Sequence, residues 1–179
     1  EGKALGKFAS DANYAAKALS EALFNRAYSL YIMSTMYGEI FVPQGYTEEL
    51  PSNYNYARES VPNIYRMLIT DLRYAYDHLP DVNEQNLTTD FGRATKGAAA
   101  HFLAKLYLQR AQGAKYGSSE YGVKADGHVD TNNQKSYLGM LYKGESAADL
   151  DSCIYYTSKV IDHGYYDLEP DFGKLFNHP

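Results

Sequence analysis

The sequence has one cysteine, no tryptophan and no excess of positive charge. Cys153 alone cannot form an internal disulfide or a cysteine-built metal site. The 17 basic and 22 acidic residues give a net charge of −5, so the chain lacks the basic field that would hold a nucleic-acid backbone. It also lacks an apolar run of the ~18 residues that a membrane-spanning helix needs, and its first residues do not resemble a signal peptide. Nucleic acid is therefore a poor partner, and we expect no membrane span.

The composition is that of a folded protein with an excess of tyrosine. Hydrophobic residues make up 45% and charged residues 22% of the 179, which suits one globular domain with a core. Tyrosine accounts for 19 residues and joins a flat apolar face to a hydroxyl group, so it suits sugars, protein partners and moist packing between helices. We expect a single domain over residues 1–179, truncated at both ends, because the sequence starts without Met.

Apolar residues recur at steps of three and four along most of the chain, which predicts helices. The predicted helices lie near 15–37, 60–79, 95–111 and 147–163. Gly38, Pro80 and Gly164 are placed to end three of them. Extended structure is indicated only briefly, at Glu39–Val42 and Tyr165–Leu168. The fold class is therefore all-α, with two antiparallel helix hairpins of the tetratricopeptide kind.

Small and apolar positions in these helices give further expectations. Gly97, Ala98 and Ala99 carry almost no side-chain bulk, so we expect them buried where two helices meet. Leu150, Cys153, Ile154, Thr157 and Ile161 form the predicted apolar stripe of the last helix. Cys153 is then expected to be a buried, inert thiol.

The predicted connections are unusually long. Loops over 38–59, 80–94 and 112–145 far exceed the ~4–6 residues typical between packed elements, and loops of that length are usually functional or disordered. The first and third loops carry many of the tyrosines. A ligand or partner surface is therefore expected on loops.

Four blocks, in order, resemble the SusD/RagB family of outer-membrane nutrient-binding lipoproteins. They are Glu21–Tyr28 with Met36–Ile40, Arg58–Tyr65 with Asp71–Leu72, Gly92–Leu108, and Tyr156–Leu168 with Leu175–Phe176. The third block, which opens with Gly-Arg-Ala-Thr-Lys-Gly-Ala, is the most specific. The resemblance covers about three-quarters of the chain. Family members are much longer, so this chain resembles their tetratricopeptide-rich part.

The resemblance implies an α-α superhelix and a non-catalytic protein at the cell surface. The family captures a glycan or oligosaccharide and delivers it to a SusC-like TonB-dependent transporter. It is held on the outer membrane by a lipidated cysteine, which would lie outside this chain. No cofactor and no metal are implied.

Aromatic rings stack on pyranose faces, and neighbouring amide or guanidinium groups supply hydrogen bonds. The candidate glycan contacts are Tyr46, Asn53, Tyr54, Asn55, Tyr56, Tyr116 and Tyr121. Arg58 lies beside this set. In the alternative interpretation, the loop rings plug the helix hairpins. The tyrosines at helical spacing are expected to be mostly packing: Tyr28, Tyr31, Tyr65, Tyr76, Tyr107 and Tyr155.

Other chemistry has weaker support. Arg93, Thr95 and Lys96 could form an anion site at a helix N-terminus, but a capped helix start is the better interpretation. The alternating oxygens from Asp126 onward suggest a calcium loop, yet the sixth position is Thr131 and the twelfth is Tyr137, which favours a solvated loop.

Two other functions stay open. A tetratricopeptide scaffold would bind a peptide in its concave face, and an all-α glycan-processing enzyme would need two carboxylates at catalytic separation. The candidate carboxylates are Glu48–Glu49, Asp149–Asp151 and Asp167–Asp171, and none stands out as a catalytic pair. The sequence leaves the identity of the glycan and the oligomeric state open.

Overall fold

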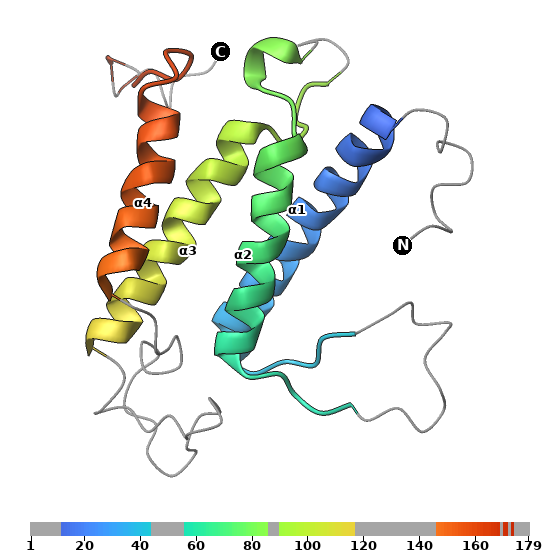
Figure 1. Cartoon of the computed structure of the whole chain (residues 1–179), viewed down its shortest axis with the longest axis vertical. Helices are drawn as coiled ribbons and strands as arrows, with labels where there is room; N and C mark the ends of the chain where they lie inside the picture. Colours follow the sequence, from blue (N-terminus) through green and yellow to red (C-terminus); the bar gives the residue numbers. More distant parts are fainter. Residues whose placement is uncertain are drawn as a thin grey trace.

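The computed structural model describes residues 12–43, 56–85, 90–116 and 146–168, together with 170, 171 and 173. The helices of this part are α1 (Ala12–Tyr37), α2 (Val61–His78), α3 (Lys96–Tyr116) and α4 (Ser146–Ile161), with a 3₁₀ turn, η3, at Val82–Glu84. Each α-helix agrees with its predicted range to within a few residues (Figure 1). The all-α prediction is confirmed.

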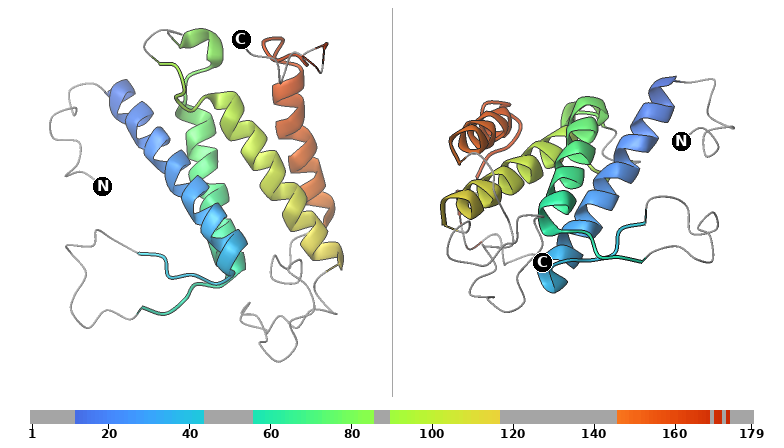
Figure 2. Two further views of the ribbon diagram at one scale, coloured as in Figure 1. Left: turned by 180° about the vertical axis from the view of Figure 1, so that it is seen from behind. Right: turned by 60° about the horizontal axis from the view of Figure 1, so that its bottom comes forward.

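The helices form two antiparallel hairpins that stand side by side. α1 packs on α2 and α3 packs on α4, while α2 against α3 joins the two hairpins. Both views in Figure 2 show α1 and α4 on the outside of this row. Among the described residues, the predicted extended segments reduce to one isolated β-bridge, between Ile40 and Glu59. That bridge closes the base of the long connection between α1 and α2.

The ends of the helices follow the expected local chemistry. Gly38 takes a φ of 73° after α1, and its N–H donates to the carbonyl of Ser34 over 2.9 Å. Only glycine adopts that conformation freely, which explains why α1 ends there. At the start of α3 the Thr95 hydroxyl accepts a hydrogen bond from the Ala98 N–H over 3.1 Å. Thr95 therefore caps α3, as the sequence predicts.

The core is built chiefly from α2 and α3. The largest fully buried apolar side chains are Val61, Ile64, Tyr65, Leu68 and Leu72 of α2 and Leu103 and Leu106 of α3. α1 adds an aromatic contact, because Phe24, Tyr28 and Tyr31 all meet the ring of Phe102 at an edge. α2 thus packs between α1 and α3, and α3 packs between α2 and α4. These two helices form the centre of the row.

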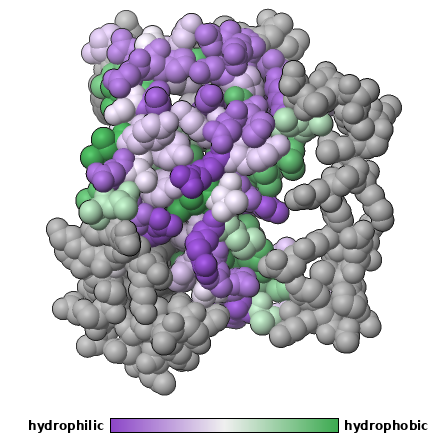
Figure 3. Space-filling model, viewed as in Figure 1, coloured by the Kyte–Doolittle hydropathy of each residue, from purple (hydrophilic) through white to green (hydrophobic). Residues whose placement is uncertain are grey.

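The prediction that an apolar stripe of α4 is buried is wrong for most of its residues. Leu150, Ile154 and Ile161 are 41%, 64% and 68% exposed. Figure 3 shows hydrophobic surface at the side of the molecule where α4 lies. Within the described part of the chain α4 packs mainly on α3, so one narrow face is covered. That face carries Asp149, Cys153, Tyr156 and Val160, with Cys153 only partly buried.

The small residues that open α3 are buried only in part. Ala99 is fully buried against Ala75 and Leu79 of α2, as predicted. Gly97 and Ala98 are partly exposed. The neighbour of Gly97 is the Tyr166 side chain, whose Cζ would lie 2.7 Å from an added Cβ. The bulk-free start of α3 therefore accommodates a tyrosine ring as well as a helix.

Candidate functional site

One of the seven predicted contact residues has a described side chain. Tyr56 is 62% exposed. Tyr116 is the last residue of α3, and its side chain lies outside the described residues. The other five predicted contacts also lie outside the described residues: Tyr46, Asn53, Tyr54, Asn55 and Tyr121. The site is therefore built from Tyr56 and what surrounds it.

Tyr56 lies on the loop stem, which we define as residues 39–43 and 56–60. The two halves of the stem are joined where the Glu59 N–H donates to the Ile40 carbonyl over 2.8 Å. Val42 is buried and joins the core, which ties the stem to the helices. The Tyr56 ring lies against Phe41, with centroids 5.1 Å apart and planes tilted by 58°. The stem thus holds an exposed aromatic ring in a fixed place.

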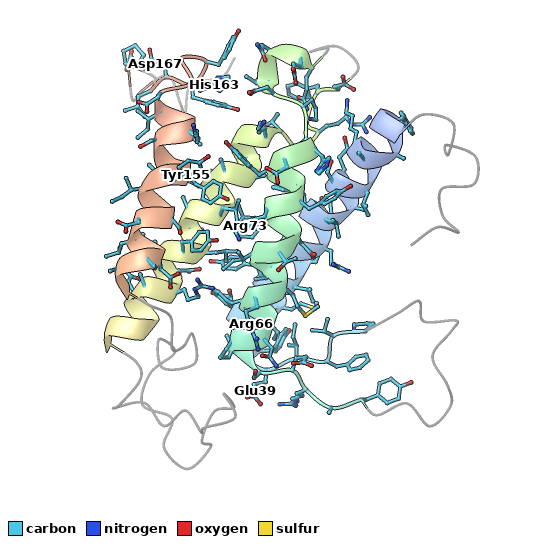
Figure 4. All side chains as sticks on the ribbon, viewed as in Figure 1. Glu39, Arg66, Arg73, Tyr155, His163 and Asp167 are labelled. Atoms are coloured by element: carbon cyan, nitrogen blue, oxygen red, sulfur yellow. The ribbon has the colours of Figure 1, made fainter. Side chains whose placement is uncertain are left out.

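A cavity of ≈ 450 Å³ lies at the same end of α2. Its lining residues are Arg26, Glu59, Asn63, Arg66, Met67, Thr70 and Asp71. Glu59 belongs to both features, since its backbone closes the stem and its side chain lines the cavity. Figure 4 shows Arg66 near the end of α2 from which the stem leaves. Except for Met67, the lining residues carry polar groups.

These polar groups form two connected sets. Arg26 of α1 donates to both carboxylate oxygens of Asp71 of α2, over 2.7 and 2.6 Å. Asn63 donates through Nδ2 to Glu59 over 2.9 Å, and its Oδ1 accepts from Arg66. The first set fixes α1 on α2. The second places a carboxylate and a guanidinium group at opposite ends of one amide.

The alternative anion site at the start of α3 is not supported. Arg93 donates to both oxygens of Glu21 over 2.9 and 2.6 Å, and these hydrogen bonds raise the pKa of Arg93. Thr95 caps the helix, and the Lys96 ammonium lies 5.1 Å from the centroid of the Tyr76 ring. All three side chains are engaged within the protein, which agrees with the structural interpretation.

Metal-binding and catalytic carboxylates are the other chemistry considered for this chain. Within the described ranges, no group of three or more His, Cys, Asp or Glu side chains could hold a metal ion. Asp149, one of the carboxylates considered for catalysis, is buried and accepts from Arg110 through both oxygens. The candidate calcium loop and the Glu48–Glu49 pair lie outside the described residues. No described helix is long and apolar enough to span a membrane.

Comparison with known proteins identifies the family. The sequence pattern of a SusD-like family, described as "Starch-binding associating with outer membrane", matches residues 5–108, which is more than half of the chain. The chain belongs to the SusD-like family. A "SusD-like protein" of Bacteroides ovatus is 27% identical over 162 residues, covering 90% of this chain and 24% of the relative. The resemblance drawn from the sequence blocks is therefore confirmed.

Solved structures share the fold. A crystal structure determined with a xylogluco-oligosaccharide superposes with a TM-score of 0.65 at 24% identity, over 93% of this chain and 27% of that one. A SusD homologue from Bacteroides thetaiotaomicron VPI-5482 gives 0.65 at 17% identity, over 92% of this chain and 26% of that one. This SusD-like chain thus spans about a quarter of the length of these relatives.

The tyrosines on the helices include both buried and exposed side chains. Tyr31, Tyr65 and Tyr107 are buried and Tyr76 is partly buried against the core, as predicted, whereas Tyr28 and Tyr155 are 54% and 51% exposed. Tyr156, which the sequence analysis did not single out, is buried and stacks on Tyr107 with centroids 5.9 Å apart. A hydrogen bond with Tyr156 raises the pKa of Arg73. In Figure 4, Arg73 lies on α2 and Tyr155 on α4.

The cavity was also missed by the sequence analysis. Its residues come from α1, from the stem and from three turns of α2, so no short motif contains them. One signal was present, because Glu59, Asn63, Arg66 and Thr70 recur at steps of four, three and four. That spacing places four polar groups on one face of a helix start.

Proposed function

We propose that this chain is part of a non-catalytic protein that binds an oligosaccharide at the cell surface and delivers it to a SusC-like TonB-dependent transporter. A lipid anchor outside this chain would hold the protein on the outer membrane. The proposed contacts are Tyr56 together with Tyr46, Asn53, Tyr54, Asn55, Tyr116 and Tyr121. Membership of the SusD-like family supports a glycan as the ligand.

The observation that carries the proposal is the exposure of Tyr56 on a closed stem. A ring that is 62% exposed presents aromatic surface to solvent on which a pyranose can stack, and Phe41 and the stem hydrogen bond support its position. Binding to a platform that is already formed avoids the cost of ordering it. The related structure determined with a xylogluco-oligosaccharide makes a plant oligosaccharide a suitable probe.

The experiment measures affinity and stability on the same variants of the full-length protein. Calorimetric titration with a xylogluco-oligosaccharide and with a linear malto-oligosaccharide covers the two glycan types that the comparisons suggest. Tyr56→Ala should weaken binding roughly two- to tenfold, the range expected for losing one stacking contact, with the Tm nearly unchanged. Tyr155→Ala, at another exposed tyrosine, on α4, is the matched control and should leave affinity unaltered.

Three results would contradict the proposal. A lower Tm with intact affinity would show that Tyr56 packs against the protein. Binding of neither glycan would favour a tetratricopeptide scaffold that takes a peptide. Shortened products after incubation would indicate an enzyme. Co-purification of the lipidated protein with a TonB-dependent transporter, from solubilised outer membranes, tests the delivery step.

A further inference from the structure

The cavity between α1 and α2 has the volume of a small-ligand site and an unusually polar lining. Its ≈ 450 Å³ lies within the range of roughly 300–1,000 Å³ that such sites occupy. It combines one apolar residue, Met67, with charged and hydrogen-bonding groups. Tyr56 does not line it, so the cavity is separate from the stacking surface of the proposed function. We propose that the cavity binds a single neutral pyranose unit through two adjacent hydroxyl groups.

The charges of the cavity leave one donor and one acceptor group for a ligand. Arg26 and Asp71 neutralise each other, with the Asp71 carboxylate buried. Arg66 is exposed, and among the described residues its guanidinium group has one partner, the Asn63 amide oxygen. Four of its five N–H donors therefore remain available.

Glu59 supplies the complementary group. One of its carboxylate oxygens accepts from Asn63 Nδ2 over 2.9 Å, which leaves lone pairs for a further donor. Asn63 joins both ends, so the guanidinium and the carboxylate are held at a fixed separation set by one amide. A hydroxyl group both donates and accepts. Two hydroxyl groups on neighbouring ring carbons can therefore accept from Arg66 and donate to Glu59 at once.

A charged ligand fits this arrangement less well. An anion drawn to Arg66 meets the negative charge of Glu59 across the Asn63 amide, and a cation drawn to Glu59 meets Arg66 in the same way. A neutral sugar satisfies both groups without repulsion. Its C–H face can lie on the Met67 side chain, which is partly buried against the core.

Met67 also provides a local reporter. The described residues contain two other methionines, Met33 and Met36, which are exposed on α1 and do not line the cavity. Full-length protein labelled with ¹³C in its methionine methyl groups is titrated with methyl β-glucoside, methyl β-galactoside and methyl β-xyloside. At least one should shift the Met67 signal saturably while Met33 and Met36 stay fixed. Absence of a Met67 shift with all three overturns the proposal.

Two variants test the assigned groups. Arg66→Met should weaken the bound glycoside about tenfold, because it removes a charge-assisted hydrogen bond. Lys159→Met, at an exposed cation of α4 outside the cavity, is the matched control. Glu59→Gln should strengthen the binding of glucuronate several-fold, since it removes the repelling charge. Tighter binding of glucuronate than of the neutral sugars by the wild-type protein would overturn the proposal.

The same titrations separate this inference from the proposed function. Tyr56→Ala should leave the Met67 titration unchanged while it weakens the oligosaccharide. If instead Tyr56→Ala abolishes the Met67 shift and Arg66→Met does not, the cavity is not a site of its own. In that case the proposal that Tyr56 stacks on an oligosaccharide is unaffected.

Discussion

Arg26 of α1 donates hydrogen bonds to both carboxylate oxygens of Asp71 of α2, from Nε over 2.7 Å and from Nη2 over 2.6 Å. The second hairpin repeats this chemistry, because Arg110 of α3 donates to both oxygens of Asp149 of α4. In each hairpin the arginine comes from the first helix and the buried aspartate from the second. Forked guanidinium–carboxylate pairs fix orientation as well as distance, so they set how each hairpin closes.

The first prediction concerns the unequal exposure of this pair. The side chain of Arg26 is 52% exposed and that of Asp71 is 6% exposed. Arg26→Met strands a buried carboxylate and should lower the free energy of unfolding by about 3 kcal/mol. Asp71→Asn should cost less, because the freed guanidinium can turn to water. Chemical denaturation of both variants checks the order.

The double variant is the control for this prediction. Arg26→Met combined with Asp71→Asn removes the stranded charge, so it should be more stable than Arg26→Met alone. Equal losses for the two single variants would mean that desolvation of Asp71 does not dominate the pair.

The helices could be predicted because each has its own apolar spacing and its own local stops. Gly38, with a φ of 73°, and Thr95, with its capping hydroxyl, act within a few residues along the chain. The bounds of α4 were predicted correctly, but the face of the helix that is buried was not. Its covered face holds Asp149, whose burial depends on Arg110, 39 residues earlier. Spacing alone treats such a buried acid as a solvent-facing residue.

The candidate site could be predicted only in part, for a similar reason. Tyr56 was singled out because it lies in a long loop that is rich in tyrosine, and its exposure agrees with that choice, while its contact with a glycan stays a prediction. The cavity depends on Arg26 meeting Asp71 across 45 residues, and on the stem bringing Glu59 to the start of α2. Such contacts arise from the packing of hairpins. A pattern confined to α2 shows only that Asn63, Arg66 and Thr70 share a face.

The second prediction uses the contact between Gly97 and Tyr166. An added Cβ at Gly97 would lie 2.7 Å from the Tyr166 Cζ, which is too close. Gly97→Ala should therefore be neutral or destabilising, although alanine usually stabilises a helical position by ~0.4–1 kcal/mol. In a Tyr166→Ala background the same change should become stabilising by that amount. Urea unfolding of the four proteins in this cycle gives the sign in each background.

The position of Tyr166 decides whether the cycle has this outcome. If Gly97→Ala is equally stabilising in both backgrounds, the Tyr166 ring moves aside without cost. Tyr166 is 38% exposed, so its removal alone should be tolerated well enough for the comparison to be made.

The last prediction is a pH dependence. Burial raises the pKa of the Tyr107 hydroxyl, and Tyr107 is 4% exposed between α2 and α4. In the unfolded chain this hydroxyl ionises at about pH 10. Because the folded protein holds the proton more tightly, its contribution to stability is complete below that pH and is lost as the pH rises through the folded pKa. The free energy of unfolding should therefore fall above about pH 10.

Tyr107→Phe removes this ionisation, so its stability should fall less steeply between about pH 10 and pH 11 than that of the wild-type protein. Tyr155→Phe is the matched control, because Tyr155 is 51% exposed whereas Tyr107 is buried. Urea midpoints from pH 8 to pH 11 give the slopes, which are compared instead of absolute values because each variant also changes stability at neutral pH. Parallel slopes for wild type and Tyr107→Phe would assign the alkaline loss to other groups, beginning with Tyr76, whose pKa is also raised by burial.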